Sequence, residues 1–439
     1  MKKIVIAGAG HGGLTAAGYL AAQGYSVEVY EKRKRDELGY DWHDTIAAST
    51  FEYAGIKVGK DEYTGRPNST FFPPNLQTPI SIDATAEQAE YSIERKVLYK
   101  HLLDNAANQG AILYFGKEVL RPYLDSVGKV AGIVTADGEV LADFVIDATG
   151  MYSPLIKHLP KEYNIASNYG EKDIFWAYRA YFNLVPDAKI VNADRFNFYF
   201  MFDGIKGLAW YKLNQGLADV LIGAVQPLDK ARLDEVLEKL REAQPSIGYE
   251  IKRGGYAGDI PLKSTLPLIV GDKFALTGDA ASMPVPMNGS GITHSIIAGK
   301  LLADTLIEAD KLGKEWTIDN IWDYQVKYFT QVGSKMIGVR VLKNFLLGLD
   351  VKELNFLFNT GILGAKELGA GAHGQEIVLD RKAIFEKIKK GWRKLFLLLK
   401  IKSVAQNSKL AKQAVLDIPK SYNASAVASW VEKINGFIS

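Results

Sequence analysis

The sequence predicts an α/β protein with a doubly wound, Rossmann-type dinucleotide-binding domain, an inserted antiparallel-sheet substrate domain and a helical C-terminal region. Three observations lead to this prediction. A strand, a glycine-rich turn and a helix open the chain, aromatic and β-branched runs fill its middle, and a core-type strand returns after them. The predicted parts are residues 1–170 and 256–312 for the nucleotide-binding domain, 171–255 for the insertion and 313–439 for the helical region.

The N-terminus has the pattern of a βαβ unit. Residues 3–7 form a short, β-branched apolar run that is typical of a buried strand. A helical pattern follows from 13 to 23, where Gly24 ends it, and residues 26–30 predict a second strand. Two strands joined by a helix run parallel, so the sheet of this domain is expected to be parallel.

The segment from Gly8 to Gly13 matches G-x-G-x-x-G between that strand and that helix. Gly8 permits a tight turn, Gly10 lets a pyrophosphate approach the backbone, and Gly13 allows close packing of helix on strand. The helix N-terminus offers free N–H groups to phosphates. Glu31, about twenty residues on, can hold ribose hydroxyls. The cofactor-binding residues predicted here are Gly8, Gly10, His11, Gly12, Gly13, Glu31 and Lys32.

Two related patterns are less specific. Lys32 opens the basic run 32–35, which would suit a 2′-phosphate but is expected to be a solvated turn. Residues 369–374 also match G-x-G-x-x-G, yet no strand precedes them, so the sequence predicts a loop between helices there.

The periodicity of apolar residues predicts the helices and strands before and after residue 171, where the insertion is expected to begin. Residues 92–109 are helical in pattern, 111–120 and 129–135 are short strands, and 140–148 predict a buried strand that ends at Thr149-Gly150. Aromatic and β-branched runs at 175–182, 196–202 and 218–225 then predict an antiparallel sheet, followed by a charged amphipathic helix over 229–243. Trp176, Tyr199, Trp210 and Tyr211 are predicted to line a mainly apolar pocket, with about half of them expected to be sheet core.

A second cofactor segment lies far downstream. Residues 273–277 predict a short strand that delivers Asp279 at its end, where a carboxylate can accept hydrogen bonds from ribityl hydroxyls. The Pro- and Gly-rich loop 283–293 lets a flat ring lie against its backbone, and a helix over 291–311 points its positive end at that ring. The two motifs together indicate FAD. The predicted flavin contacts are Gly278, Asp279, Gly289, Ser290, Gly291 and Ile292, and Pro286 is a predicted substrate contact.

These motifs resemble those of the flavoprotein superfamily that includes p-hydroxybenzoate hydroxylase and the geranylgeranyl reductases, and the reductase branch looks closest. The resemblance implies FAD phosphates at Gly8–Gly13 and a ribityl chain at Gly278-Asp279. Asp147-Ala148-Thr149-Gly150 looks like the family's middle motif, and Ile93-Glu94-Arg95 is similar to the helix whose arginine contacts the cofactor. The FAD contacts that this comparison adds are Arg95, Val119, Thr149 and Gly150.

Two departures from the reductase branch stand out. The segment Gly207–Tyr211 is similar to the branch's Tyr/Trp-rich substrate strand, but Tyr211-Lys212 stand where a Phe-Pro pair is expected. Many reductases of that branch carry a cysteine shortly after the second strand, whereas this chain has residues 39–44 there and contains no cysteine. The substrate and the reaction direction therefore stay open.

Candidate acid–base residues cluster in Asp41, His43 and Asp44, on a loop expected to pass near the flavin ring. Two carboxylates beside His43 would favour its charged form. The alternative is an ordinary polar loop in which Asp44 caps a helix that starts at Thr45. His294 could face the flavin, although packing within its own helix is the simpler expectation.

Composition narrows the other possibilities. The absence of cysteine excludes disulfides, thiolate metal sites and a cysteine nucleophile, and the scattered histidines predict no metal site. A net charge of +3 gives no argument for nucleic acid. No apolar run reaches the roughly 18 residues that a membrane helix needs, so a cytoplasmic location is expected.

The segment 381–402 suggests a membrane surface. It contains nine Lys or Arg residues beside Trp392 and the run Leu395–Leu399. A basic amphipathic helix of this kind can lie in a lipid interface or can pack on the body of the protein. Peripheral membrane contact through 381–402 is therefore one prediction of the sequence.

The leading functional prediction is FAD-dependent reduction of C=C bonds in a hydrophobic, isoprenoid-like small molecule or lipid, with NAD(P)H as a candidate electron donor. The first alternative is an aromatic hydroxylase that uses NAD(P)H and oxygen. The second is a flavin-bearing membrane-surface protein without turnover of its own.

Overall fold

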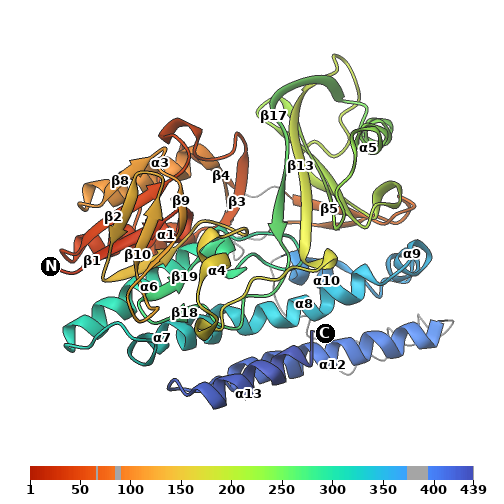
Figure 1. Cartoon of the computed structure of the whole chain (residues 1–439). Coiled ribbons are helices and arrows are strands. Elements are labelled where there is room, and N and C mark those ends of the chain that lie inside the picture. The colour runs from red at the N-terminus through yellow and green to blue at the C-terminus, as the bar shows by residue number, and fades with distance from the viewer. Residues whose placement is uncertain (66–67, 85–89, 373–393, 439) are drawn as a thin grey trace.

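The computed structural model describes residues 1–65, 68–84, 90–372 and 394–438. A Rossmann-type layer lies on one side of the molecule and a large, mainly antiparallel sheet on the other, with long C-terminal helices running beneath both (Figure 1). The doubly wound domain with an added antiparallel sheet confirms the predicted fold class.

The nucleotide-binding layer is built on a six-stranded sheet. All neighbouring pairs are parallel except the pair at one edge, β18–β19. In order across the sheet the strands are β18 (Val270–Gly271), β19 (Phe274–Leu276), β12 (Phe144–Asp147), β1 (Lys3–Ala7), β2 (Ser26–Glu31) and β8 (Ile112–Phe115). Since β12 lies between β1 and β19, the chain segments that follow these three strands leave the sheet side by side.

The helices of this layer hold those segments together. α1 (His11–Ala22) packs between α3 (Arg95–Asn108) and α6 (Ile292–Lys311). A Cβ added at Gly18 would lie 2.7 Å from Asn105 Nδ2, which marks the close approach to α3. One large hydrophobic core extends from the parallel sheet through these helices.

The predicted strand over 140–148 is wrong in its continuity, because the structure has two strands there. β11 (Gly138–Leu141) joins β10 (Val130–Thr135) and β9 (Val119–Leu124) in a separate antiparallel sheet. Asp143 separates β11 from β12: its N–H donates to Lys3 O and its carboxylate accepts from Lys3 N–H at 2.7 Å.

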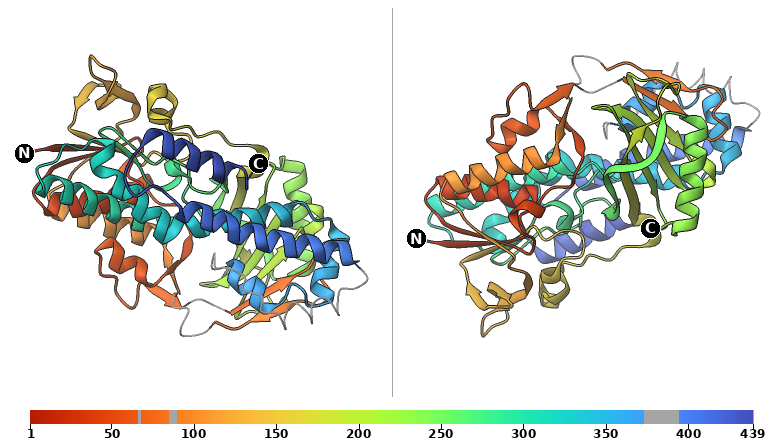
Figure 2. Two further views of the ribbon diagram at one scale, coloured as in Figure 1. Left: turned by 90° about the horizontal axis from the view of Figure 1, so that it is seen from below. Right: turned by 90° about the horizontal axis from the view of Figure 1, so that it is seen from above.

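The second layer is a seven-stranded sheet that differs from the predicted insertion at both ends. Its order is β17 (Ile247–Pro261), β13 (Ile174–Leu184), β16 (Leu217–Ala224), β15 (Gly207–Asn214), β14 (Arg195–Phe200), β5 (Asn68–Phe72) and β6 (Ile80–Ile82). The boundary of 255 cuts through β17. The last two strands come from the first segment, where β5 pairs parallel to β14. The helix α5 (Lys230–Ala243) covers the face of this sheet that points away from the nucleotide-binding layer (Figure 2).

A small antiparallel sheet connects the two layers and contradicts the predicted helix at Thr45. Its strands are β3 (His43–Ala47), β7 (Glu90–Glu94) and β4 (Tyr63–Gly65). Thr45 pairs with Ser92 within β3–β7, and the next helix, α2, begins only at Ser49 and ends at Ala54. The predicted helix over 92–109 accordingly starts at Arg95, after β7.

The C-terminal helices close the molecule from below. They are α7 (Ile318–Tyr328), α8 (Ser334–Leu347), α9 (Val351–Asn359), α10 (Ala365–Ala372), α12 (Leu395–Leu416) and α13 (Ala424–Asn435), with a π-helical turn, η6 (Phe329–Gly333), between α7 and α8. α12 packs along α8, where Ser408 Oγ donates to Gly338 O at 3.0 Å. Trp322 and Trp430 are buried in the main core, so this region is part of the same body rather than an appendage.

Short helical turns occupy the connections. They are α4 (Pro154–His158), η1 (Arg35–Glu37), η2 (Lys161–Tyr163), η3 (Glu171–Asp173), η4 (Phe202–Gly204) and η5 (Gly278–Ala281).

Two predictions about the C-terminal region are partly outside the described residues. The second glycine pattern, 369–374, was expected to be a loop, but its first four residues end helix α10 and the last two lie outside the described chain. Of the basic segment 381–402, only 394–402 is described. Among the helices of the described ranges, none is both long and apolar enough to cross a membrane.

Candidate active site

The glycine loop after β1 is fitted against the middle motif after β12. Gly8 has a φ of +85°, and a Cβ there would lie 2.5 Å from the carbonyl oxygen of Ala148. A Cβ at Gly10 would lie 2.9 Å from the same oxygen. Glycine is therefore required at both positions, and the resulting backbone turn leaves its N–H groups as the surface that a phosphate can approach.

The glycine loop also contacts the downstream cofactor segment, at Thr277 and Ser295. A Cβ at Gly12 would lie 2.1 Å from Thr277 Oγ1 and 2.5 Å from Ser295 O. Gly13 performs the predicted close packing, since a Cβ there would lie 3.0 Å from Ile6 Cγ2. Gly12 thus joins the first cofactor segment to the second, a contact that the sequence pattern alone did not indicate.

Glu31 ends β2 beside this loop. Its Oε2 accepts from Ala9 N–H at 2.8 Å and its Oε1 from Arg33 N–H at 2.9 Å. The remaining lone pairs of the carboxylate can accept from ribose hydroxyls. Lys32 is exposed next to it, and Val119 is a buried core residue, so Val119 could contact a cofactor only through its backbone.

His11 is the first residue of α1 and carries an unsatisfied polar atom. Its Nε2 is buried and has no hydrogen-bond partner among the described residues. Its ring centre lies 4.6 Å from that of Tyr99. Burial, assisted by the charge of Arg95, lowers the pKa of His11 to about 3, so the imidazole is neutral.

Arg95 begins α3 and is held by Asp44 rather than exposed. Its Nη2 donates to Asp44 Oδ1 at 2.7 Å and its Nε donates to Oδ2. Burial alone would raise the pKa of Asp44, but the charge and hydrogen bonds of Arg95 outweigh it and hold that pKa below its ordinary value. The guanidinium lies over the rings of Tyr40 and Trp42, 5.1 and 5.6 Å from their centres.

Asp279 follows β19 in η5 and points its carboxylate at the same space. None of the described residues donates a hydrogen bond to its side-chain oxygens. Burial raises its pKa to about 6, an effect that Arg95 partly opposes. An unpartnered, partly buried acceptor of this kind suits a ligand rich in hydroxyl groups. Gly278, with a φ of +67°, provides the turn that orients it.

The middle motif, residues 147–150, is held in place by hydrogen bonds to its own buried carboxylate, Asp147. Asp147 is fully buried, and its carboxylate accepts from the Thr149 hydroxyl at 2.7 Å, from Thr149 N–H and from Ser153 Oγ. Because the Thr149 hydroxyl hydrogen is engaged in this way, Thr149 and Gly150 can offer a cofactor mainly their backbone.

The loop before α6 forms the floor of the site. Gly289 has a φ of +74°, and a Cβ at Gly291 would lie 2.9 Å from Pro284 Cγ, so the backbone of this loop is exposed to a flat ligand. Ile292 is the first residue of α6, whose free N–H groups face the same space, and Ser290 is exposed. His294 lines the cavity and donates from Nδ1 to Met283 O at 3.1 Å, which leaves Nε2 as an acceptor.

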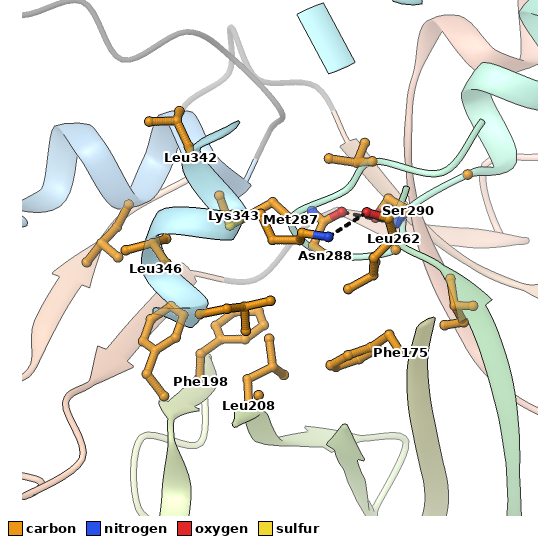
Figure 3. A pocket seen from close by; sticks show the side chains of 18 of the residues that line it. Phe175, Phe198, Leu208, Leu262, Met287, Asn288, Ser290, Leu342, Lys343 and Leu346 are labelled. Atoms are coloured by element: carbon orange, nitrogen blue, oxygen red, sulfur yellow. Dashed lines mark hydrogen bonds between the residues drawn. The ribbon is translucent and has the colours of Figure 1, made fainter. Parts of the chain in front are cut away.

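A cavity of about 1260 Å³ runs from His11, Arg95 and Asp279 into the space between the seven-stranded sheet and the C-terminal helices. Away from the cofactor segments its walls are mainly apolar (Figure 3). The labelled apolar residues are Phe175, Phe198 and Leu208 from the sheet, Leu342 and Leu346 from α8, and Leu262 and Met287 from loops. The far end is lined by α9 and α10, and α12 lines the cavity along its length, from Leu395 to Leu416.

Of the predicted substrate contacts, only Trp210 lines this cavity. Trp176, Tyr199 and Tyr211 lie on the other face of the sheet, where Tyr199 and Tyr211 are buried beneath α5. Side chains alternate along a strand, so Trp210 and its neighbour Tyr211 cannot face the same side. Pro286 is buried in its loop and is not a cavity residue, although Val285 and Met287 are.

The predicted acid–base cluster is divided among different partners. Asp41 pairs with Arg253 at 3.2 Å, and Asp44 with Arg95. His43 is buried, with Nδ1 at 3.2 Å from Glu94 Oε1, and burial lowers its pKa. The prediction that neighbouring carboxylates favour charged His43 is therefore wrong, because desolvation outweighs them.

The sequence did not predict a buried charged cluster of three residues, two of which, Arg179 and Lys212, line the cavity. Arg179 on β13 and Asp219 on β16 form a bidentate pair, and Lys212 on β15 lies 3.6 Å from Asp219. All three are at least nine-tenths buried. Charged residues within strands of otherwise apolar and aromatic character were the signal available in the sequence.

These features fit a bound FAD. The glycine loop would hold the pyrophosphate, Glu31 the ribose and Asp279 the ribityl chain, while the unpaired His11 Nε2 and the α6 N-terminus face the same ligand space.

A family model described as FAD dependent oxidoreductase matches residues 90–305, and one described as an NAD(P)-binding Rossmann-like domain matches 6–54.

The chain belongs to the FAD-dependent oxidoreductases. Within the described residues of this oxidoreductase, no group of three His, Asp or Glu side chains could hold a metal ion.

The oxidoreductase is similar to proteins of the predicted reductase branch. It is 21% identical over 450 aligned positions to the digeranylgeranylglycerophospholipid reductase of Sulfolobus acidocaldarius, covering 99% of this chain and 97% of that protein. It is 27% identical to the protein of the same name from Thermoplasma volcanium, covering 70% and 78%. The crystal structure of a geranylgeranyl bacteriochlorophyll reductase-like protein from Thermoplasma acidophilum superposes with a TM-score of 0.73 at 22% identity, covering 92% of this chain and 99% of that one.

Proposed function

We propose that this FAD-dependent oxidoreductase reduces C=C bonds in a hydrophobic, isoprenoid-like chain that enters the large cavity. The observation that carries this proposal is the apolar extension of the cavity from the flavin segments to α12. Full-length similarity to digeranylgeranylglycerophospholipid reductases supports the same substrate class. A small phenol would leave most of such a cavity unfilled.

The residues of the chain would divide the work as follows. Gly8–Gly13, Glu31 and Asp279 bind the cofactor, which when reduced supplies a hydride. The N-terminus of α6 would stabilise negative charge on the bound cofactor. Phe175, Phe198 and their apolar neighbours would exclude water and bind the isoprenoid substrate beside the cofactor.

We also propose that the N-terminal end of α12 touches the membrane from which such a substrate would be drawn. Phe396 is 85% exposed, and Leu395 and Leu399 are each 54% exposed, beside Lys394, Lys400 and Lys402. Leu395, Leu399 and Lys402 also line the far end of the cavity. An exposed aromatic and aliphatic tip flanked by lysines suits an anionic lipid interface.

Liposome flotation tests the membrane contact. We expect Phe396→Ser with Leu399→Ser to reduce binding to vesicles containing anionic lipid, whereas Leu410→Ser, which removes a 47% exposed leucine farther along the same helix, should not. Equal binding by all variants would refute this contact without affecting the proposed reaction.

The reaction is tested with dithionite-reduced, FAD-loaded protein under anaerobic conditions. Incubation with a geranylgeranyl lipid should produce saturated species that mass spectrometry separates by two hydrogens for each double bond reduced. Rapid NAD(P)H oxidation with oxygen, stimulated by a phenol and without alkene reduction, would instead establish the hydroxylase. Flavin binding without either activity would contradict both.

A further inference from the structure

The apolar cavity contains one strongly polar place on its sheet wall. Arg179, Lys212 and Asp219 stand on the adjacent strands β13, β15 and β16, and Arg179 and Lys212 line the cavity. Arg179 is 5%, Lys212 4% and Asp219 0% exposed. Trp210 precedes Lys212 on the same face, and the Lys212 Nζ lies 4.6 Å from the ring centre of Phe196.

The two cations share a single carboxylate. Arg179 takes both oxygens of Asp219, through Nε at 2.9 Å and Nη2 at 2.6 Å. Lys212 Nζ lies 3.6 Å from Asp219 Oδ2, beyond hydrogen-bond distance. Among the described residues, none accepts a hydrogen bond from Lys212 Nζ or from Arg179 Nη1.

Neighbouring carboxylates do not supply the missing partner, because each has another cation. Asp44 is bound by Arg95, and Glu94 is bound by Arg253 at 2.8 Å. The cavity wall therefore presents a buried ammonium that shares its one ion-pair partner, Asp219, with Arg179, next to a guanidinium with one free –NH₂ group. Two buried positive charges on one carboxylate leave one charge uncompensated, which is costly, and the usual remedies are deprotonation or a bound anion. Burial does lower the pKa of Lys212, against the opposing effect of Asp219.

We propose that Lys212 and Arg179 bind an oxyanion at the end of the hydrophobic substrate, a phosphate or carboxylate group, and so fix which double bond reaches the flavin. Arg179 suits this task because its planar fork is already oriented by Asp219. The guanidinium also lies 5.3 Å from the ring centre of Trp42, on the loop that leads to Asp44, the partner of Arg95, so the anion would be held near the cofactor end of the cavity rather than at its far end. This inference rests on the proposed function, since it names the head group of the same substrate.

The inference also accounts for one departure from the reductase pattern. Lys212 occupies the second position of the Phe-Pro pair expected after Trp210. A prolyl side chain offers no donor, whereas lysine at this inward-facing position places an ammonium in the cavity. The substrate head group is therefore where this chain is expected to differ in specificity.

The test compares geranylgeranyl phosphate with geranylgeraniol and with inorganic phosphate. Binding to the FAD-loaded protein is measured by titration calorimetry and by changes in the flavin spectrum. We expect the isoprenoid phosphate to bind tightest, and Lys212→Met to weaken its binding by about 30-fold or more while leaving the alcohol unaffected. Lys212→Arg should restore most of the affinity. Lys189→Met, which removes an exposed lysine between β13 and β14 that does not line the cavity, is the matched control.

Lys212→Met leaves Arg179 and Asp219 as a neutral pair, so the variant is expected to fold, which its melting temperature and flavin content will report. Equal affinity of the native protein for phosphate and alcohol would overturn the inference while the proposed function stands. The inference would also be overturned if Lys212→Met bound the phosphate and the alcohol with equally reduced affinity. A loss of FAD affinity in this variant would overturn it too, because the ammonium would then bind the cofactor and not the substrate. If neither isoprenoid binds although FAD does, the proposed function itself fails. Binding of inorganic phosphate alone would mean that the site holds a free anion and not a substrate head group.

Discussion

The contact between α1 and α6 gives the sharpest test of how the two cofactor segments are held together. A Cβ at Gly299 of α6 would lie 2.1 Å from the carbonyl oxygen of Gly12, 2.9 Å from its carbonyl carbon and 3.0 Å from its Cα. All three are backbone atoms, so no side-chain rotation can relieve the clash. Gly299→Ala must therefore push α6 away from the glycine loop.

The size of the effect follows from that distance. A carbon and a carbonyl oxygen approach to about 3.3 Å, so the helices must separate by roughly 1 Å. Overpacking of this kind costs about 3 kcal/mol, and the better helix propensity of alanine returns about 1 kcal/mol. We expect a net loss of about 2 kcal/mol in the free energy of unfolding. FAD affinity should fall by at least about tenfold, because the loop Gly8–Gly13 moves relative to Asp279.

Urea unfolding of the apoprotein and fluorescence titration with FAD measure the two effects. Gly369→Ala is the matched control: Gly369 is also helical, but its added Cβ would meet only Ile82 Cδ1 at 3.7 Å. That variant should gain about 0.5–1 kcal/mol and bind FAD normally. Native stability and FAD affinity in Gly299→Ala would refute the argument that this crossing joins the two halves of the site.

Three further predictions follow from the site. Arg95→Met should destabilise the protein by about 3–5 kcal/mol in urea unfolding, because it leaves the Asp44 carboxylate buried without its partner, and adding Asp44→Asn should recover much of that loss. Trp210→Ala should weaken isoprenoid binding, whereas Tyr199→Phe, on the opposite face, should leave binding unchanged and cost about 1 kcal/mol of stability through its lost hydrogen bond. The stability of the apoprotein relative to that of His11→Asn should fall as the pH falls from 6.5 toward 3, because His11 takes up a proton in the unfolded chain but stays neutral in the folded protein. Between pH 7 and pH 5 this His11 contribution is about 2 kcal/mol, and the opposite contribution of Asp279, whose pKa is raised to about 6, is common to both proteins.

The cofactor segments could be predicted because their signals are local. A strand, a glycine turn and a helix fix Gly8–Gly13 within a few residues, and Glu31 and Asp279 each stand at the end of a short apolar strand. The parallel order β19-β12-β1 then brings these ends together, as the general rule for such sheets requires. The Gly12–Gly299 contact escaped prediction because it depends on how two distant helices cross.

The substrate-binding residues were harder to predict, because their positions depend on which face of each strand is turned toward the cavity. The aromatic run around Tyr199 and Trp210 has large residues on both faces, so composition does not select one. Strand β5 joins the sheet by pairing with β14, more than a hundred residues along the chain, and β6 joins through β5; no local pattern reveals the long-range pairing. The environment of His43 is likewise tertiary: its flanking carboxylates bind Arg253 and Arg95, and burial decides its charge.

The central claim is that one FAD is grasped at its adenosine end by the loop after β1 and at its ribityl end by the segment after β19. Titration of the apoprotein with FAD and with FMN, which lacks the adenosine half, tests it most directly. The account predicts one equivalent of FAD bound, with an affinity at least about 100-fold above that for FMN, because only FAD reaches Gly8–Gly13 and Glu31. Equal affinity for the two flavins, or no binding of either, would contradict it.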